Sequence, residues 1–503
     1  MTTTYKKLAI ILVFLFSLSS CDSLLDLDAE NNFSLDDLST TENIERALSG
    51  AYYGLGGFSD GFSGGELYGG DFILISELIS KRSDVAWLVS SGGADHEAFF
   101  NHNIVRTNPI VEANWVRGYE VINLINNVLA NLDNVTDPTT RNRINGEALA
   151  IRAAIYFEMV RLWAPQYSPT NISEPALPLI TEPVASINEV QNPSKATVGQ
   201  IYTQIENDLT NASALLESFG KNGVNISYFA CQAFLARVSV QKNDFASALT
   251  HANNIIDANE FTLLNNALDA FNNLSNSPED IFAIQQTLAN NAGDRTTGVG
   301  LTTYVSALTE SGFGVLGIID THLFSRSPNF TSPSFYSEDE RVQINLNIDE
   351  ATTSDAITTA FYRNPVNTGL LASSKYIRAD HVIPVIRLAE IYLIRAEALY
   401  ELNPGTVNTD ALAALNVVRE RAGIEALQTA DFADPSSLYD SIAFERKREL
   451  LFEGHLLHDL RRTRMFKNDP EIVIGIERFG ENPLNTDLIL PIPQSETDAS
   501  GLN

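Results

Sequence analysis

Six Lys or Arg side chains and two His side chains are concentrated in one 21-residue stretch, FERKRELLFEGHLLHDLRRTR, at residues 444–464. The whole chain carries 33 Lys and Arg against 63 Asp and Glu, which gives a formal net charge of −30. Four kinds of site concentrate cations in this way: a phosphate site, a nucleic-acid patch, a catalytic cluster, or an internal network of ion pairs. The residues interleaved with the cations distinguish between these possibilities.

A row of carboxylates runs through the same stretch. Glu445, Glu449 and Glu453 are spaced i, i+4 and i+8, so on a helix they stack on one face and repel one another. Interleaved Leu and Phe residues are typical of a half-buried helix, where carboxylates need partners, so we expect an internal lattice of ion pairs. Arg446 or Arg448 should then face protein rather than a ligand pocket, whereas a phosphate or catalytic site is the alternative. Partners for the glutamates are expected among Arg387, Arg395, Arg419 and Arg421.

Other motifs that could do chemistry are incomplete. Residues 312–317, GFGVLG, match the GxGxxG pattern but lack the strand before and the helix after that a dinucleotide site requires. The stretch HEAFF begins like a zinc-binding HExxH helix at His96, but Phe100 stands where the second ligand would be. With 63 carboxylates, a glycosidase acid pair can be neither found nor excluded. The sequence therefore predicts no catalytic residues, no metal and no cofactor.

The N-terminal residues have the order of an export signal. Two lysines precede an apolar stretch at residues 8–18, and LSSC then resembles a bacterial lipobox. We interpret residues 1–20 as a lipoprotein signal peptide and Cys21 as the lipid-bearing residue; an ordinary secretory signal with a chance cysteine is the alternative. Cys231 lies in an apolar helical stretch and is expected to be a buried, inert thiol without a disulfide partner.

Helical periodicity dominates the elements that must position these residues. Residues 227–257 and 385–423 each contain two alanine-rich helices joined by a turn, with Asp244 and Thr409 as expected caps and Gly423 as an expected terminator. Small residues at this spacing let antiparallel helices pack closely, which resembles tetratricopeptide helix pairs; any antiparallel helical hairpin is the alternative.

Residues 258–375 differ in composition from the helical segments, because they are rich in Asn, Ser, Thr, Gly and Pro. Short alternating pieces such as IFAIQQ and VQINLNI predict minor strands among long loops, where binding surfaces usually lie. Trp115 and Trp163 lie on helical faces and are expected in the core. The excess of acidic residues argues against nucleic acid as a partner.

Several of these segments together resemble the SusD/RagB family of outer-membrane nutrient-binding lipoproteins of Bacteroidetes. The resemblance is carried in the C-terminal half by IRLAEIYLIRAEALYE, ALNVVRERAG, FERKRELLFEGHLLHDLRR and LPIPQSETD. In the N-terminal half it is carried by LLDLD, ALSGAYYGL and NWVRGYEVINLINNVL, so it covers nearly the whole mature chain in order.

The resemblance implies a mostly α fold of tetratricopeptide-like helix pairs with long loops and minor β-strands. A SusD-like N-terminal region (21–220) and a RagB/SusD C-terminal region (221–503) would form one compact unit. The family implies no catalysis: the protein would sit on the outer membrane through its lipid anchor, capture an oligosaccharide or peptide, and deliver it to a TonB-dependent transporter. A helical-repeat interaction scaffold and a glycan-degrading enzyme are the alternatives.

Two aromatic residues are candidates for contact with the ligand. Flat aromatic side chains stack on the apolar faces of sugar rings. Trp87 stands in the non-periodic stretch KRSDVAWLVSSGG, and its place after Asp84 resembles where glycan-binding family members carry an aromatic residue. Tyr304, in the loop-rich region, could face it. A core position for Trp87 is the alternative.

Overall fold

The fold is described from a computed structural model. It covers residues 37–58, 64–80, 93–184, 194–221, 223–293, 300–305, 342–343, 362–363, 372–373, 375–462 and 488–502. Cys21, Trp87 and the GFGVLG stretch lie outside the described residues.

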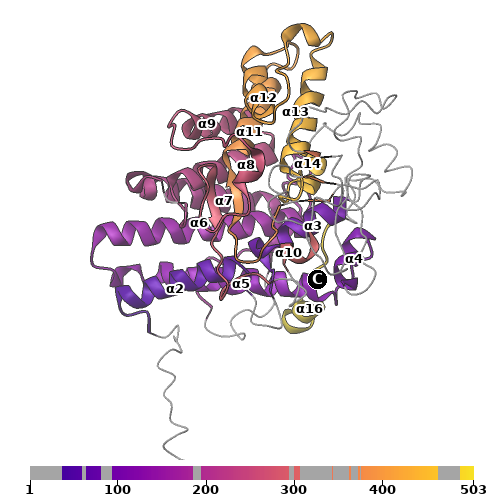
Figure 1. Ribbon diagram of the computed structural model, residues 1–503. Coiled ribbons are helices and arrows are strands. Elements are labelled where there is room, and N and C mark those ends of the chain that lie inside the picture. The colour runs from indigo at the N-terminus through magenta and orange to yellow at the C-terminus, as the bar shows by residue number, and fades with distance from the viewer. Residues whose placement is uncertain are drawn as a thin grey trace, which may run out of the picture.

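Antiparallel helices stack one upon the next through the body of the protein. Figure 1 shows them rising in chain order from α2 and α5 at the base to α12 and α13 at the top. These helices are α2 (Thr41–Leu55), α5 (Pro109–Ala130), α6 (Pro138–Trp163), α7 (Val198–Leu216), α8 (Tyr228–Lys242), α9 (Phe245–Ile256), α11 (Leu388–Leu402), α12 (Thr409–Arg421) and α13 (Ser436–Leu450). The mostly helical prediction is confirmed.

Shorter helices and small sheets lie beside this stack. The shorter helices are α3 (Asp71–Ser80), α4 (Ala94–Phe100), α10 (Leu301–Tyr304), α14 (Leu456–Arg462) and α16 (Gln494–Ser500). Antiparallel pairs are formed by β1 (Pro175–Pro178) with β2 (Lys195–Thr197), and by β3 (Asp280–Ile284) with β7 (Ile383–Arg387). A third sheet joins β4 (Val342–Gln343), β5 (Tyr362–Arg363) and β6 (Ala372–Ser373). The strands predicted in IFAIQQ and VQINLNI are confirmed by β3 and β4.

The turn between α8 and α9 forms as its residues predict. Asn243 takes the left-handed conformation, with φ of 60°, which reverses the chain in a few residues. Asp244 then caps α9, because its Oδ1 accepts a hydrogen bond from the Ser247 amide at 3.1 Å. Ala236 and Ala248 are fully buried, so the two helices approach closely.

The expected cap of α12 is wrong by one residue. Asn408, not Thr409, precedes the helix, and its Oδ1 accepts from the amides of Asp410 at 2.9 Å and Ala411 at 3.0 Å. A cap must reach the amides two and three positions onward, and Asn408 is placed to do so while Thr409 is already helical. Gly423 follows the end of α12 with φ of 73°, which confirms it as a terminator.

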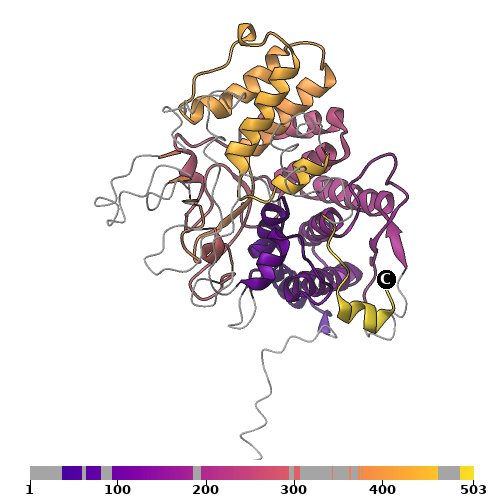
Figure 2. The ribbon, with the colours of Figure 1, turned by 90° about the vertical axis from the view of Figure 1, so that its right-hand side faces the viewer.

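The C-terminal tail lies against the first long helices (Figure 2). The amide of Leu490 donates to the Leu162 carbonyl at 2.9 Å, and the Trp163 indole donates to the Pro491 carbonyl at 3.1 Å. Trp115 is 2% exposed and Trp163 5% exposed, so their predicted core positions are confirmed. Cys231 is likewise fully buried, and burial raises the pKa of its thiol. Among the described helices, none is both long and apolar enough to span a bilayer.

Candidate functional site

The cation-rich stretch forms a buried lattice of ion pairs with the helix pair before it. Glu449, fully buried on α13, accepts a hydrogen bond from Arg387 Nη1 at 2.6 Å and a second from Arg421. Glu445, on the same helix face, lies 3.4 Å from Arg419 Nη1. Three of the four expected arginines therefore pair with the glutamate row, and the predicted internal lattice is confirmed.

The second half of the stretch pairs inside the protein as well. Arg446 Nε donates to Asp459 Oδ2 at 2.7 Å, so this side chain faces protein as expected. Arg462 donates to both carboxylate oxygens of Glu397, at 2.7 and 2.9 Å. Arg461 donates to the Ala164 carbonyl at 2.8 Å and so caps the end of α6. These contacts favour a structural lattice over a phosphate or nucleic-acid surface.

One feature of the stretch differs from the expected continuous helix. α13 ends at Leu450 and α14 begins at Leu456, because Phe452 and Gly454 take left-handed conformations with φ of 65° and 81°. Glycine is needed at position 454, since an added Cβ would lie 3.2 Å from the Cα of Ile73 on α3. We call residues 451–455 the keystone turn.

The keystone turn still holds Glu453 within the lattice. Glu453 accepts from Arg387 Nε at 2.7 Å and from Lys375 Nζ at 2.7 Å. Burial alone would raise the pKa of Glu453, but Arg387 and Lys375 outweigh it and hold the pKa below its ordinary value. The Lys375 ammonium also donates to the carbonyls of Glu449 at 3.1 Å and Leu451 at 2.9 Å. Lys375 was not among the predicted partners, because it lies outside the preceding helix pair.

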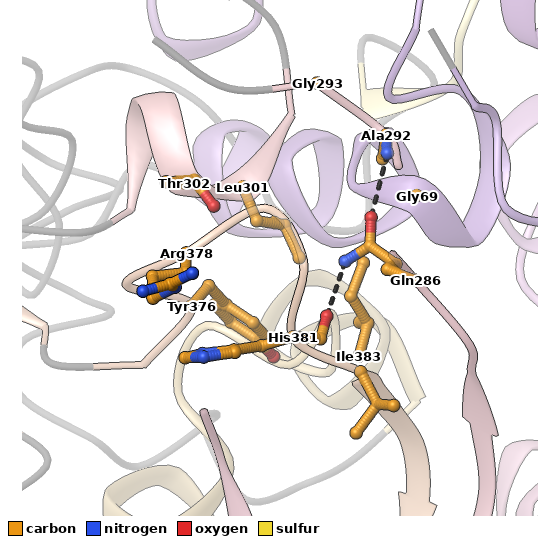
Figure 3. A pocket seen from close by; sticks show the side chains of 11 residues that line it. Gly69, Gln286, Ala292, Gly293, Leu301, Thr302, Tyr376, Arg378, His381 and Ile383 are labelled. Atoms are coloured by element: carbon orange, nitrogen blue, oxygen red, sulfur yellow. Dashed lines mark hydrogen bonds between the residues drawn. The ribbon is translucent and has the colours of Figure 1, made fainter. Parts of the chain in front are cut away.

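A pocket lies beside this lattice (Figure 3). It contains about 250 Å³ of empty space, part of it open solvent. Its walls come from four separate parts of the chain: the turn before α3, the segment after β3, helix α10, and the segment leading into β7. The lining residues are Gly69, Gln286, Ala292, Gly293, Leu301, Thr302, Tyr376, Arg378, His381, Val382 and Ile383.

Arg378 and His381 line one wall of the pocket, and Asp380, which does not line it, lies close to both of them. Arg378 makes a two-pronged ion pair with Asp380, with donor–acceptor distances of 2.8 and 2.7 Å. That hydrogen bonding lowers the pKa of Asp380, so the carboxylate is ionised at neutral pH. Burial lowers the pKa of the adjacent His381, so its imidazole is neutral there. The cluster places hydrogen-bond donors and acceptors beside apolar surface at the edge of the pocket.

The sequence alone does not predict this cluster. The feature of the sequence that points to this cluster is the segment YIRADH, residues 376–381. Its charged residues lie at the end of the loop-rich region, shortly before β7. The signal is weak, because a charged loop is most often simply solvated. Only the fold brings Arg378 and His381 next to Thr302.

Tyr304 lies at the end of α10, not in a loop as expected. It is 7% exposed, and its ring centroid is 4.2 Å from that of His96. Burial raises the pKa of Tyr304 to about 12, with Asp71 and Asp95 adding to the shift. The same short helix contributes Leu301 and Thr302 to the pocket, so Tyr304 is one turn from its wall.

His96 has a partner of its own. Its Nε2 lies 3.4 Å from Asp71 Oδ1, while Asn114 Nδ2 donates to the other oxygen of Asp71 at 2.7 Å. Among the described residues, no group of three or more His, Cys, Asp or Glu side chains is arranged to hold a metal ion. The described contacts of His96 thus give it a packing role.

A buried carboxyl next to the keystone turn should make stability depend on pH. Glu77 accepts from the Gly454 amide at 3.1 Å, and burial raises its pKa from 4.5 to about 8, with Lys375 opposing the shift. The folded state thus binds this proton more tightly than the unfolded chain. The contribution of the protonated Glu77 to the free energy of unfolding is complete below pH 4.5 and is lost as the pH rises to about 8. Over this range the free energy of unfolding falls by at most about 1.4 kcal/mol per pH unit.

Replacing Glu77 by Gln removes the titratable carboxyl group but keeps a side-chain oxygen that can accept a hydrogen bond from the Gly454 amide. The difference in unfolding free energy between wild type and Glu77→Gln should therefore change steadily between pH 5 and 8, in the direction that favours the variant at higher pH. Urea titrations at three pH values measure it. A difference that stays constant across this range would show that Glu77 is ionised throughout.

Comparisons with known proteins agree with the described fold. Residues 320–502 match the family model described as the SusD family, and residues 79–240 match one described as "Starch-binding associating with outer membrane". SusD-like protein P2 of Formosa agariphila is 24% identical over 91% of this chain and 90% of its own length.

Solved structures give the same result for the fold. A SusD superfamily protein from Bacteroides thetaiotaomicron has a TM-score of 0.72 at 22% identity, covering 92% of this chain and 98% of its own. A structure titled "Laminarin binding SusD-like protein" has a TM-score of 0.63 at 23% identity, covering 91% of this chain and 97% of its own. With two family models matching successive parts of the sequence and relatives aligned along nearly its full length, the chain belongs to the SusD/RagB family.

Proposed function

We propose that this protein is a cell-surface lipoprotein that binds an oligosaccharide and delivers it to a TonB-dependent outer-membrane transporter. The observation that carries the proposal is the match of residues 79–240 to the family described as starch-binding and associating with the outer membrane. A structural neighbour titled as laminarin-binding supports the same ligand class. The pocket is compatible with this ligand class, because the polar side chains of Arg378 and His381 lie there beside apolar ones.

The proposed activity is binding without catalysis. Glu449, Glu453, Arg446 and Arg462 of the cation-rich stretch are paired in the lattice, so these charged side chains are committed to structure. Its two histidines, His455 and His458, are buried, and burial and then neighbouring arginines lower the pKa of both, which keeps them neutral. A glycan-degrading enzyme would instead release product from a glycan. A protein-interaction scaffold would bind no glycan.

The anchor and the organisation of the chain are part of the proposal. Cys21 would carry the lipid after removal of residues 1–20, and would hold the protein on the outer membrane. Residues 21–220 and 221–503 would act as one unit. Contacts across that boundary support this: Arg461 of α14 donates to the Arg161 carbonyl at 2.6 Å, and the Gly454 amide donates to Glu77 at 3.1 Å.

Trp87 is proposed as the aromatic platform of the ligand face, with Tyr304 near it. An aromatic stacking contact is worth roughly 0.5–1.5 kcal/mol beyond the burial of area. Trp87→Ala should therefore weaken glycan binding about tenfold or more, because both the stacking contact and the buried area are lost. The unfolding midpoint should not change. Tyr53→Ala is the control, because Tyr53 is an aromatic residue 46% exposed on α2.

Titration of both variants with the glycan that binds wild type best measures the effect. Loss of affinity in Trp87→Ala alone supports the platform. Equal affinities for wild type and Trp87→Ala would show that Trp87 does not contact the glycan, and a variant that is unfolded would place Trp87 in the core.

A further inference from the structure

A second cavity lies where the two halves of the chain meet. It contains about 340 Å³ of empty space, part of it open solvent. Its walls come from the turn before α3, from α3 and α6, from α8, from β7 and from the keystone turn. We call it the arginine cavity, after two of the polar and charged residues that line it: Tyr68, Glu158, Arg161, Arg237 and Glu453.

Both arginines of this cavity keep hydrogen-bond donors that their ion pairs do not use. Arg161 and Arg237 are each 5% exposed. Arg237 donates to Glu390 through Nε at 2.9 Å and Nη2 at 2.6 Å, which leaves the two hydrogens of Nη1 outside the pair. Arg161 pairs with Glu158 through Nη2, and its Nε is buried without a partner in the described part of the chain. A buried donor without an acceptor destabilises the fold, so an acceptor is expected here.

The two carboxylates that line the cavity are engaged elsewhere. Glu158 accepts from the Tyr68 hydroxyl at 3.3 Å through Oε1 and from Arg161 through Oε2. Glu453 accepts from Lys375 through Oε1 and from Arg387 through Oε2, both at 2.7 Å. Neither carboxylate therefore supplies the acceptor for Arg161 Nε.

The ion pairs behind the cavity carry one more positive than negative charge. Arg461 is buried and donates to two backbone carbonyls, one of them that of Arg161 at 2.6 Å, and no described carboxylate pairs with it. Five buried guanidinium groups thus stand against four buried carboxylates among the described residues of this network, in a protein whose net charge is −30. They are Arg161, Arg237, Arg446, Arg461 and Arg462, against Glu158, Glu390, Glu397 and Asp459.

His458 shows the same shortage of acceptors and negative charge. It is 2% exposed, and neither ring nitrogen has a hydrogen-bond partner among the described residues. Burial, and then the charges of Arg161 and Arg461, lower its pKa, so the ring adds no charge of its own. A buried excess of positive charge is costly unless an anion balances it.

We propose that the arginine cavity binds one small monovalent anion of the size of chloride, held by Arg161 and Arg237. One negative charge balances the excess, and an anion accepts hydrogen bonds from the unused donors. A doubly charged anion such as sulfate would lose more hydration and be repelled more strongly by Glu158 and Glu453. Because α6 belongs to the N-terminal half and α8 to the C-terminal half, the anion would stabilise their junction. The proposal does not depend on glycan binding.

Thermal unfolding of the mature protein tests the effect on stability. Sodium chloride would be exchanged for sodium gluconate at constant ionic strength, since gluconate is too large to be enclosed beside the two arginines. The unfolding midpoint should rise by about 1 °C for each tenfold increase in chloride above its dissociation constant. Equal midpoints in the two salts would overturn the proposal.

A conservative variant places the effect in the cavity. Arg161→Lys keeps a cation beside Glu158 but removes the Nε donor, so it should weaken the dependence on chloride about tenfold or more. Arg143→Lys is the control, because Arg143 lies on the same helix, pairs with Glu147 at 3.1 Å and is 30% exposed. The control should respond to chloride as wild type does. An Arg161→Lys protein that did the same would overturn the proposal.

Bromide locates the site without any variant. Crystals of the wild-type protein soaked in sodium bromide should give an anomalous-scattering peak within hydrogen-bond distance of Arg161 and Arg237. Water density there without an anomalous signal would overturn the anion site and leave the proposed glycan-binding function untouched.

Discussion

Replacing Glu449 by Ala should lower the free energy of unfolding by about 3–5 kcal/mol, because it removes one partner of a buried ion pair and leaves the other charged. Glu449 is fully buried and accepts from Arg387 at 2.6 Å and from Arg421, both of which are also buried. The guanidinium groups of Arg387 and Arg421 would then stay buried and charged without the carboxylate of Glu449. Denaturant titration followed by circular dichroism measures the loss.

The same variant separates structure from binding. Among the molecules that remain folded, Glu449→Ala should bind glycan with nearly wild-type affinity, because Glu449 does not line the pocket. Glu120→Ala is the control: it breaks an exposed pair with Arg117, in which the Glu120 side chain is 56% exposed, and should cost less than about 1 kcal/mol. A Glu449→Ala protein as stable as Glu120→Ala, or a selective loss of affinity, would reopen the interpretation of the stretch as a binding site.

Replacing Cys21 by Ala should release the protein from the outer membrane. The proposed lipid is attached at this residue alone, so the variant should be unlipidated and appear in the soluble fraction. Membrane fractionation together with labelling by radioactive palmitate measures both effects. Cys231→Ala is the control, because Cys231 is fully buried and is not a lipidation site. A Cys21→Ala protein that still labels and stays in the outer membrane would show that the lipobox interpretation is wrong.

The sequence predicts the structure best where periodicity and local chemistry act together. The α8–α9 pair could be predicted with its cap at Asp244, because a short turn and two alanine-rich helices leave few arrangements. The keystone turn is not predicted, because the i, i+4, i+8 spacing of the glutamates favours one helix through Glu453. Tertiary contacts decide that break: Gly454 packs directly on Ile73 of α3, nearly 400 positions earlier, which no local pattern reveals.

The sequence predicts that the lattice exists, but it predicts only some of the residues that form it. Buried carboxylates must have partners, and the nearest arginines in sequence supplied them. Lys375 and Glu279 joined the lattice from outside the expected helix pair: Glu279 accepts from Arg421 at 2.9 Å. The pocket was beyond prediction, because Gly69, Thr302 and His381 are distant in sequence and meet only in the folded chain.

The central claim is that this protein binds a glycan and leaves it intact, and isothermal titration calorimetry on the mature protein tests it most directly. Purified protein would be titrated with starch-derived and laminarin-derived oligosaccharides and with a panel of other glycans and peptides. The account predicts that at least one oligosaccharide gives heats that saturate, with a baseline that returns to its starting level after each injection. Heats that never saturate with any glycan, or a continuing heat that shows turnover of the bound glycan, would contradict it.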